Sequence, residues 1–239
     1  MKMRMITKLL RKALPVQSCG AIIVAAGNAS RMGGIDKVMA PLQGEPMIVH
    51  AVRAFQESPT IKQIVVVTRK DLILDVTDLC SGMNKVIAVV EGGADRQASV
   101  EAGLDALSFK MNLVAIHDGA RPLISREVID RTVRAAHNYA AAAPGIPVKD
   151  TIKVVKGGVV QETPDRSKLY AIQTPQIFDR DLLVGALHRA RKDNAAITDD
   201  CSALERIGMT VKIVEGDEKN LKVTTPTDLK IAQLLMEDM

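Results

Sequence analysis

The chain has 239 residues, of which 47% are hydrophobic and 25% are charged, as is typical of a globular protein with a buried core. These proportions exclude a disordered, collagen-like or low-complexity chain, and an aromatic content of 2% leaves few rings on which single-stranded nucleic acid could stack. The net charge of +4 comes from the first 18 residues, which contain basic but no acidic residues. The rest of the chain is nearly neutral, so no basic surface for nucleic acid is indicated.

Residues 1–18 form a basic extension ahead of the first predicted strand. Lys8, Arg11 and Lys12 interrupt every apolar stretch that could act as a secretory signal, and no stretch reaches the about 18 apolar residues of a membrane span. An amphipathic helix on anionic lipid and a solvated tail both fit the extension, and we expect the tail. The three cysteines are widely spaced, which indicates reduced thiols in a cytoplasmic protein without a zinc site.

The first half of the chain alternates between predicted strands and helices. Continuous apolar runs predict buried strands at 20–26, 61–68, 85–93 and 112–118. Helical spacing predicts helices at 45–58, 71–81, 94–107 and 125–139, the last capped by Ser125. This alternation predicts an α/β, Rossmann-like fold with a mainly parallel central sheet covered by helices. Ligands of such folds bind beyond the carboxyl ends of the strands.

The second half contains a predicted hairpin arm at about 149–166. Two short β-branched runs flank Gly157 and Gly158, which can supply positive φ in the turn. A lone hairpin has no helix to cover it, so we expect it to project and to contact another partner. Further helices are predicted at 179–192, from about 198 behind a Thr198 or Asp199 cap, and from 225, with short strands at 210–216 and 220–224. We expect 19–239 to form a single domain that includes the arm.

The loop at 24–37 is the first candidate for chemistry, because it directly follows a predicted strand. It lacks the Gly-Lys-Ser/Thr end of a Walker A loop, and Ala29 stands where a dinucleotide-binding loop needs its second glycine. Its small side chains would let backbone amides approach an anion, and Arg31 and Lys37 could neutralise a polyphosphate. An ordinary turn with two solvated cations is an equally open interpretation.

Two further candidate segments, 91–100 and 117–122, follow the third and fourth predicted strands. Gly93 and Ser99 could read the edge of a base through a backbone amide and a hydroxyl, although a plain helix start would look the same. Asp118 could bind a sugar hydroxyl or a metal, and Arg121 could hold a phosphate. The alternative is a surface Asp118–Arg121 ion pair, which would contribute little to stability.

Taken in order, several segments resemble the 2-C-methyl-D-erythritol 4-phosphate cytidylyltransferase family. They extend from about residue 21 to residue 235 and read AAGNASRM, DK, GGADRQASV, HDGARP, PVKDT, DR, TPQIF, ITDDCSALE and NLKVTTPTDL. The resemblance implies a nucleotidyltransferase fold with an extended hairpin arm, working as a cytoplasmic homodimer without nucleic-acid or membrane partners. It also implies transfer of CMP from CTP to methylerythritol phosphate in non-mevalonate isoprenoid biosynthesis, with Mg²⁺ held mainly through the CTP phosphates.

The resemblance also implies roles for individual residues. Catalytic charge stabilisation falls to Arg31, Lys37 and Lys222. Nucleotide binding falls to Ala25, Ala26, Gly27, Gly93, Ser99 and Gly119. The acceptor sugar phosphate would contact Asp118, Arg121 and Thr174, with Thr151 and Arg166 reaching it from the partner's arm. No residue is implied as a direct metal ligand. Asp36 and Val38 flank Lys37 where the family often has Pro and Gln, which affects the expected geometry of this loop.

Three alternative functions stay open from the sequence. A relative acting on ribitol 5-phosphate would use the same CTP chemistry, and a nucleotidyltransferase using GTP would have a similar fold. The GGADRQAS segment argues for cytosine over guanine. A catalytically inactive nucleotide-binding regulator is the third alternative, and the presence of Arg31, Lys37 and Lys222 together argues against it.

Overall fold

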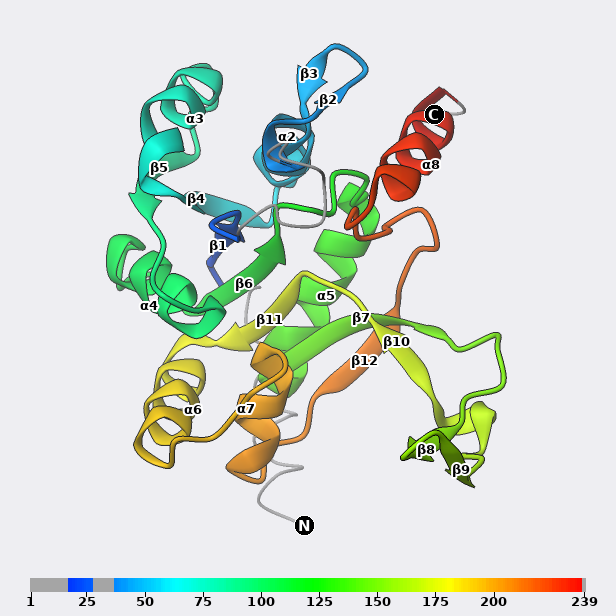
Figure 1. The fold of residues 1–239 in the computed structure, drawn as a ribbon. Helices are drawn as coiled ribbons and strands as arrows, with labels where there is room; N and C mark the ends of the chain where they lie inside the picture. Colours follow the sequence, from blue (N-terminus) through cyan, green and yellow to red (C-terminus); the bar gives the residue numbers. More distant parts are fainter. Residues whose placement is uncertain (1–16, 28–36, 238–239) are drawn as a thin grey trace.

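A computed structural model describes residues 17–27 and 37–237 of the chain, drawn in colour in Figure 1. Most of the basic extension and the loop that carries Arg31 and Asp36 lie outside the described residues. The described part is organised around a mixed β-sheet with helices on both faces (Figure 1). The predicted α/β architecture is therefore confirmed.

The sheet has its parallel strands at the centre and on one side. From one edge to the other its strands are β10 (Tyr170–Ile172), β7 (Ala141–Pro147), β11 (Gln176–Asp179), β6 (Leu113–Asp118), β1 (Cys19–Val24), β4 (Ile61–Thr68) and β5 (Val86–Glu91), and β12 (Lys212–Glu215) also pairs with β7. Strands β6, β1, β4 and β5 run parallel, whereas β11 is antiparallel to both of its neighbours. In this register Val24 lies beside Val67 and Asp118, so the carboxyl ends of three strands meet at one edge.

The helices form two layers because side chains alternate across the sheet. The helices are α2 (Met47–Glu57), α3 (Ile73–Leu79), α4 (Arg96–Ala106), α5 (Arg126–Tyr139), α6 (Arg180–Lys192), α7 (Asp200–Arg206) and α8 (Pro226–Glu237). On β1, Ala21 and Ile23 pack into one core with α2, α3 and α5, whereas Ile22 packs into the other core with α4, α6 and α7. A third, smaller core joins α8 to the short hairpin of β2 (Pro41–Leu42) and β3 (Glu45–Pro46).

Two local predictions are wrong. Residues 220–224 are not a strand: Val223 makes one backbone hydrogen bond, from its amide to the Ala120 carbonyl at 2.8 Å, and buries its side chain in the third core. The apolar residues of this segment, Leu221 and Val223, pack into the third core instead of pairing in the sheet. Ser125 does precede α5, but its side chain makes no capping hydrogen bond. By contrast, Asp199 caps α7 as predicted, in a reciprocal capping box with Ser202.

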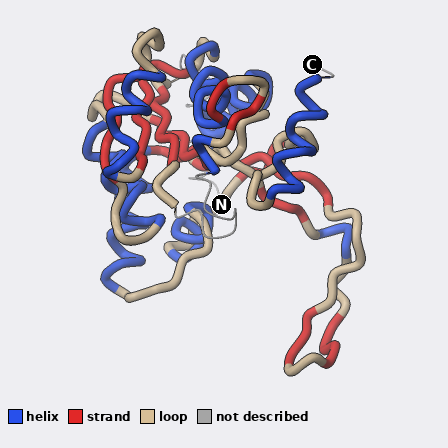
Figure 2. Tube along the Cα trace, turned by 45° about the horizontal axis from the view of Figure 1, so that its top comes forward, coloured by secondary structure: helices blue, strands red, loops and turns tan. Residues whose placement is uncertain are grey.

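The hairpin arm extends away from the sheet, as Figure 2 shows. It consists of β8 (Val154–Lys156) and β9 (Val159–Glu162), joined by Gly157 and Gly158 with φ of +58° and +79°. Two consecutive positive φ values match the two-residue turn that the glycines predict. Every residue of both strands is exposed, including Val155 and Val159. A short 3-10 turn, η3 (Arg166–Lys168), connects the arm back to β10.

Candidate active site

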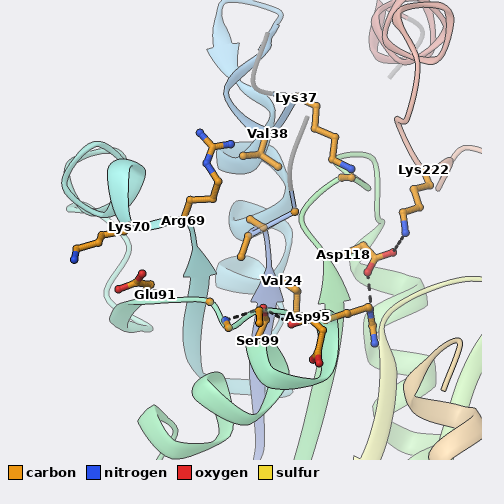
Figure 3. A pocket seen from close by; sticks show the side chains of 18 residues that line it. Val24, Lys37, Val38, Arg69, Lys70, Glu91, Asp95, Ser99, Asp118 and Lys222 are labelled. Carbon is orange, nitrogen blue, oxygen red and sulfur yellow. Dashed lines mark hydrogen bonds and ion pairs between the residues drawn. The ribbon is translucent and has the colours of Figure 1, made fainter. Parts of the chain in front are cut away.

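A cleft of about 490 Å³ lies beyond the carboxyl ends of β1, β4, β5 and β6 (Figure 3). The segment after β1 contributes Ala25, Ala26 and Gly27 to its lining, and the segment after β5 contributes residues 92–96. Lys37 and Val38 of the 3-10 turn η1 (Lys37–Met39) line the opposite side. The sheet register thus places the predicted nucleotide-binding loops around one cavity at the predicted edge.

Two glycines allow the loops of this cleft to lie close together. A β-carbon on Gly92 would lie 2.3 Å from the Ala26 β-carbon, and one on Gly93 would lie 2.3 Å from the Ala98 β-carbon. Both distances are shorter than atoms tolerate, so any side chain here would push the β5–α4 loop away. Backbone groups instead of side chains therefore form this wall, which suits the recognition of a flat base.

The Ser99 hydroxyl stabilises the same loop. It donates to the Asp95 carbonyl at 2.9 Å and accepts from the Gly93 amide at 3.2 Å, while the Asp95 carboxylate caps α4 by accepting from the Ala98 amide. Ser99 is buried, and both of these hydroxyl partners belong to the same loop. Its predicted contact with cytosine stays a prediction, and the role that the contacts themselves establish is to shape the β5–α4 loop.

Several basic side chains line the cleft. Lys37 and Lys222, which are 185 positions apart in the sequence numbering, both point into it (Figure 3). Arg69 and Lys70 follow β4 at one side, and Arg96 begins α4. The structure thus brings two of the three predicted catalytic cations together, while Arg31 lies outside the described residues. A cavity with this lining is suited to a polyanion.

Asp118 lies at the base of the cleft between three cations. Its Oδ2 atom is 2.7 Å from Lys222 Nζ and 4.0 Å from Arg121 Nε, and its Oδ1 atom is 3.7 Å from an Arg96 nitrogen. Burial by itself would raise the pKa of Asp118, but the charges of Lys222 and Arg96 outweigh that effect and lower the pKa. Asp118 is therefore a carboxylate at neutral pH, and it holds Lys222 in a defined position.

A buried chain of hydrogen bonds supports Asp118 from below. Its backbone amide donates to the Thr174 hydroxyl at 3.1 Å, and that hydroxyl lies 3.0 Å from Nδ1 of His117. Nε2 of His117 lies 3.1 Å from the Arg121 carbonyl, which can only accept. His117 therefore carries its proton on Nε2, and Thr174 donates to Nδ1. Burial lowers the pKa of His117 to about 4, which keeps the ring neutral.

The remaining predicted residues are three substrate residues and the nucleotide-binding Gly119, and they lie in different parts of the structure. Arg121 is largely buried, and its guanidinium donates to the Asn220 carbonyl at 2.7 Å. Gly119 packs tightly: a β-carbon there would lie 2.9 Å from Ile48. Thr151 and Arg166 lie in the exposed arm, where Arg166 donates to the Lys149 carbonyl, and neither lines the cleft. The structure does not bring these two arm residues to the site of their own chain.

Sequence reasoning missed Arg69, Lys70 and Arg96 as residues of the cleft. The signal for the first two was their position directly after a buried strand, β4, whose carboxyl end lies at the ligand-binding edge. Arg96 belongs to the segment GGADRQASV, in which only Gly93 and Ser99 are given roles. No neighbouring residue points to a role for Arg96, because its ion-pair partner Asp200 is 104 residues away in the sequence.

No cluster of three or more His, Cys, Asp or Glu side chains among the described residues is arranged to hold a metal ion. Both Asp118 oxygens already face cations. Mg²⁺ commonly keeps few protein ligands and binds through substrate phosphates, so this lining fits a cation that arrives with a polyphosphate. Within the same residues, no helix has the length and apolar character needed to cross a bilayer.

The parallel strands, the cleft at their carboxyl edge and its cationic lining define an α/β nucleotidyltransferase. A family model described as 2-C-methyl-D-erythritol 4-phosphate cytidylyltransferase matches residues 19–238. The chain belongs to this family, and with it the predicted enzyme class and the predicted role in the non-mevalonate pathway are confirmed.

Individual relatives agree with this assignment. The 2-C-methyl-D-erythritol 4-phosphate cytidylyltransferase of Caldanaerobacter subterraneus is 44% identical over 225 residues, covering 90% of this chain and 97% of the relative. That of Symbiobacterium thermophilum is 46% identical over 219 residues, covering 91% and 92%. The crystal structure of 4-diphosphocytidyl-2C-methyl-D-erythritol synthase from Anaerococcus prevotii superposes with a TM-score of 0.84 at 30% identity, covering 92% of this chain and 96% of that one.

Proposed function

We propose that the enzyme transfers CMP from CTP to 2-C-methyl-D-erythritol 4-phosphate with the help of Mg²⁺, and that it works as a homodimer. The observation that carries the proposal is the cleft at the carboxyl edge of the sheet. One wall is backbone and small side chains, and Lys37 and Lys222 point in beside a fixed Asp118. A base and a polyphosphate need these two different surfaces side by side.

The reaction joins two anions, so charge controls its rate. An oxygen of the acceptor phosphate attacks the α-phosphorus of CTP, the bond to the β-phosphate oxygen breaks, and pyrophosphate leaves. No nucleophilic side chain is needed, and catalysis consists of positioning and electrostatic stabilisation. In our proposal Lys37 and Lys222 stabilise the charge that develops, together with Arg31. Cations fixed before the reaction are more effective than mobile ones, because they need no reorganisation during it.

The pairing of Lys222 with Asp118 serves this role. The Lys222 ammonium has three donors, and one of them is directed to Asp118 at 2.7 Å. Its side chain is 43% exposed, so the other donors can reach a phosphate in the cleft. Asp118 thus orients the lysine without neutralising all of its hydrogen-bonding capacity.

Mg²⁺, when bound through the triphosphate, would neutralise part of the charge on the leaving pyrophosphate. We assign CTP binding to Ala25, Ala26 and Gly27 with Gly93, Ser99 and Gly119 around the base and ribose. Asp118, Arg121 and Thr174 are assigned to the acceptor, because they meet beside Lys222 at the end of β6. The Thr174 proton is already donated to His117, so its hydroxyl can offer the acceptor only a lone pair.

The homodimer proposal is based on the arm. Val154, Val155, Val159 and Val160 are between 45% and 62% exposed, which is unusual for a β-branched cluster on one short hairpin. A two-fold dimer would cover these side chains with a second copy and would bring Thr151 and Arg166 to the partner's cleft. We further propose that 19–239 is a single catalytic domain to which this arm belongs.

Release of pyrophosphate tests the proposed function directly. The purified chain is mixed with each of the four nucleoside triphosphates and either methylerythritol phosphate or ribitol 5-phosphate, with and without Mg²⁺. We expect release only with CTP, methylerythritol phosphate and the metal. Release with ribitol 5-phosphate or with GTP at comparable kcat/KM would overturn the assigned substrates, and equal release after chelation would overturn the metal requirement.

A further inference from the structure

Asp200 is a buried carboxylate that the proposed mechanism leaves without a role. It is the first residue of α7 and is completely buried, and its Oδ2 atom accepts a hydrogen bond of 2.7 Å from Arg96. The same Arg96 nitrogen is 3.7 Å from Oδ1 of Asp118. Arg96 therefore lies between a carboxylate in the interior and a carboxylate in the cleft.

We propose that Asp200 is a positioning residue: through Arg96, it holds the Asp118 carboxylate in the orientation that the acceptor requires. This inference rests on the proposed function, because it takes Asp118 as a residue that contacts the acceptor sugar phosphate. Asp200 itself touches no substrate. Its effect is transmitted through a chain of alternating charges, Asp200, Arg96, Asp118 and Lys222.

Arg96 is well placed for this transmission. Its side chain is about one-third exposed and lines the cleft, so it is held at one end by the protein interior and open to the cleft at the other. Burial by itself would lower the pKa of Arg96, but the charges of Asp200 and Asp118 outweigh it and raise the pKa. A guanidinium is planar and rigid, so fixing one of its nitrogens also fixes the direction of the others.

Asp200 is itself held firmly. The backbone amides of Asp200 and Cys201 donate to Oε1 of Gln176 at 3.0 and 3.1 Å, and the Gln176 amide donates to the Asp199 carboxylate. Gln176 begins β11 two residues after Thr174, and β11 pairs antiparallel with β6, the strand that ends at Asp118. The start of α7 is thus tied to the same strands that carry Asp118.

The energetics argue against a purely stabilising role for Asp200. Its Oδ1 atom is buried without a hydrogen-bond partner among the described residues, and burial raises the pKa of its carboxyl. Buried ion pairs of this kind often contribute less stability than apolar residues of the same volume. The Asp200 charge has a clear use in the cleft, where Lys222 holds one Asp118 oxygen and Arg96 faces the other. When Lys222 engages a phosphate, Arg96 still restrains the carboxylate.

The test compares Asp200→Asn with wild type in steady-state pyrophosphate release. This change keeps the shape of the side chain and removes its charge. We expect kcat/KM for methylerythritol phosphate to fall roughly 10- to 100-fold, with a raised KM for that acceptor, as when a supporting residue of a functional group is lost. The KM for CTP should stay within about twofold. Arg96→Gln, at a partly exposed position, should raise the KM for the acceptor in the same way even if Asp200→Asn fails to fold; because Arg96 itself lines the cleft, the KM for CTP is compared only in Asp200→Asn.

Two controls lie on the same helix. Glu205→Gln removes a charge from an exposed position of α7, and Ser202→Ala removes the hydroxyl that accepts from the Asp199 amide and donates to the Asp199 carbonyl. Ser202→Ala should lower the thermal midpoint and leave both KM values unchanged, since a loss of folded protein lowers only the apparent kcat. If Asp200→Asn and Arg96→Gln behave like Ser202→Ala, with unchanged KM values, the positioning role is wrong.

A double-mutant cycle with Asp118 separates the proposed path from independent damage. If Asp200 acts through Asp118, adding Asp200→Asn to Asp118→Asn should cost at most about twofold more. If the double variant instead loses kcat/KM by the product of the two single losses, the proposal is overturned. The wild-type assay distinguishes failure of the proposed function from failure of this inference. No release from CTP and methylerythritol phosphate would refute the proposed function, whereas an active wild type with an unaffected Asp200→Asn would refute only this inference.

Discussion

The cleft and the hairpin arm differ in how far other parts of the chain contact their side chains. In the cleft, Asp118 lies between three cations and is supported from below by His117 and Thr174. In the arm, no residue of β8 or β9 is buried, and four valines face solvent. The cleft acquires its geometry within one chain, whereas the arm has a defined backbone that no described residue of the chain covers.

This difference suggests a division of work between copies of the chain. A nucleotide-binding cleft has to be in place before the ligand arrives, because preorganised charges lower the barrier most. An arm that reaches a neighbouring cleft needs only a stable hairpin turn and apolar side chains to bury on contact. Gly157 and Gly158 supply the turn, and in the proposed dimer the exposed valines would supply the contact surface. The following predictions test each side of this comparison.

The largest effect is expected in the cleft, at Lys37. If the ammonium stabilises charge on the triphosphate, Lys37→Ala should lower kcat on the order of 10²–10³-fold, with a smaller change in KM, as for removal of one preorganised group. Lys70→Ala is a matched control, because Lys70 also lines the cleft but points away from its centre (Figure 3). Steady-state kinetics check both variants, and an unchanged kcat for Lys37→Ala would remove it from the catalytic set.

The burial of His117 below Asp118 predicts a pH-dependent stability. The pKa of His117 is lowered to about 4 in the folded chain, so the unfolded chain binds an extra proton between that value and the ordinary pKa of 6.5. Stability from this group is full above that window and is lost as the pH falls through it. The loss should reach roughly 2 kcal/mol between pH 7 and pH 5. The groups that face the ring are Asp118, Arg121 and Thr174, with Phe55 packed at 4.9 Å.

Urea unfolding at several pH values measures this contribution. His117→Gln should be less stable at pH 7 but should lose less stability than wild type on acidification to pH 5, because glutamine does not titrate. Parallel pH curves for the two proteins would contradict the assignment of a neutral, buried His117.

Subunit mixing tests whether the arm completes the partner's site. Arg166→Ala and Lys222→Ala homodimers should each be weakly active. In a mixed dimer one site would carry both lesions and the other neither, so random reassociation of equal amounts should recover roughly a quarter of wild-type activity, as two-fold symmetry requires. A tagged subunit confirms that exchange has occurred. Recovery no higher than the average of the two variants would show that both residues act in the same chain.

The smallest effect is expected at the N-terminus. A chain beginning at Ser18 should keep its activity and its thermal midpoint, because Ser18 still donates to the Lys110 carbonyl and its own carbonyl still accepts from the Leu113 amide. Among the described residues, the one hydrogen bond lost is the weak 3.4 Å contact from the Gln17 amide to Nδ1 of His137. Differential scanning calorimetry and pyrophosphate release check this expectation, and a large drop in either would mean that the extension packs on the fold.

The sequence by itself determined the elements whose signals are local. The β-branched run at 61–68 coincides with β4, and the glycine pair at 157–158 makes the expected turn. Asp199 caps α7 through a bond to a backbone amide three residues ahead. The cleft loops were equally readable, because each loop follows directly on an apolar strand, whereas the family was indicated by the resemblance of an ordered set of motifs. Strands, turns, caps and loop positions depend on neighbouring residues, so periodicity and turn chemistry are enough to find them.

Only the tertiary structure decided which distant groups meet. The apolar pattern of 220–224 predicted a strand, but that segment lies outside the sheet. Its Lys222 points into the cleft, and its Val223 packs into the core under α8. The Arg96–Asp200 pair joins positions 104 residues apart and has no local signal. The pKa of His117 depends on burial that no neighbour in the sequence reveals. Charge networks and burial arise from the packing of separate elements, so a pattern of adjacent residues cannot specify them.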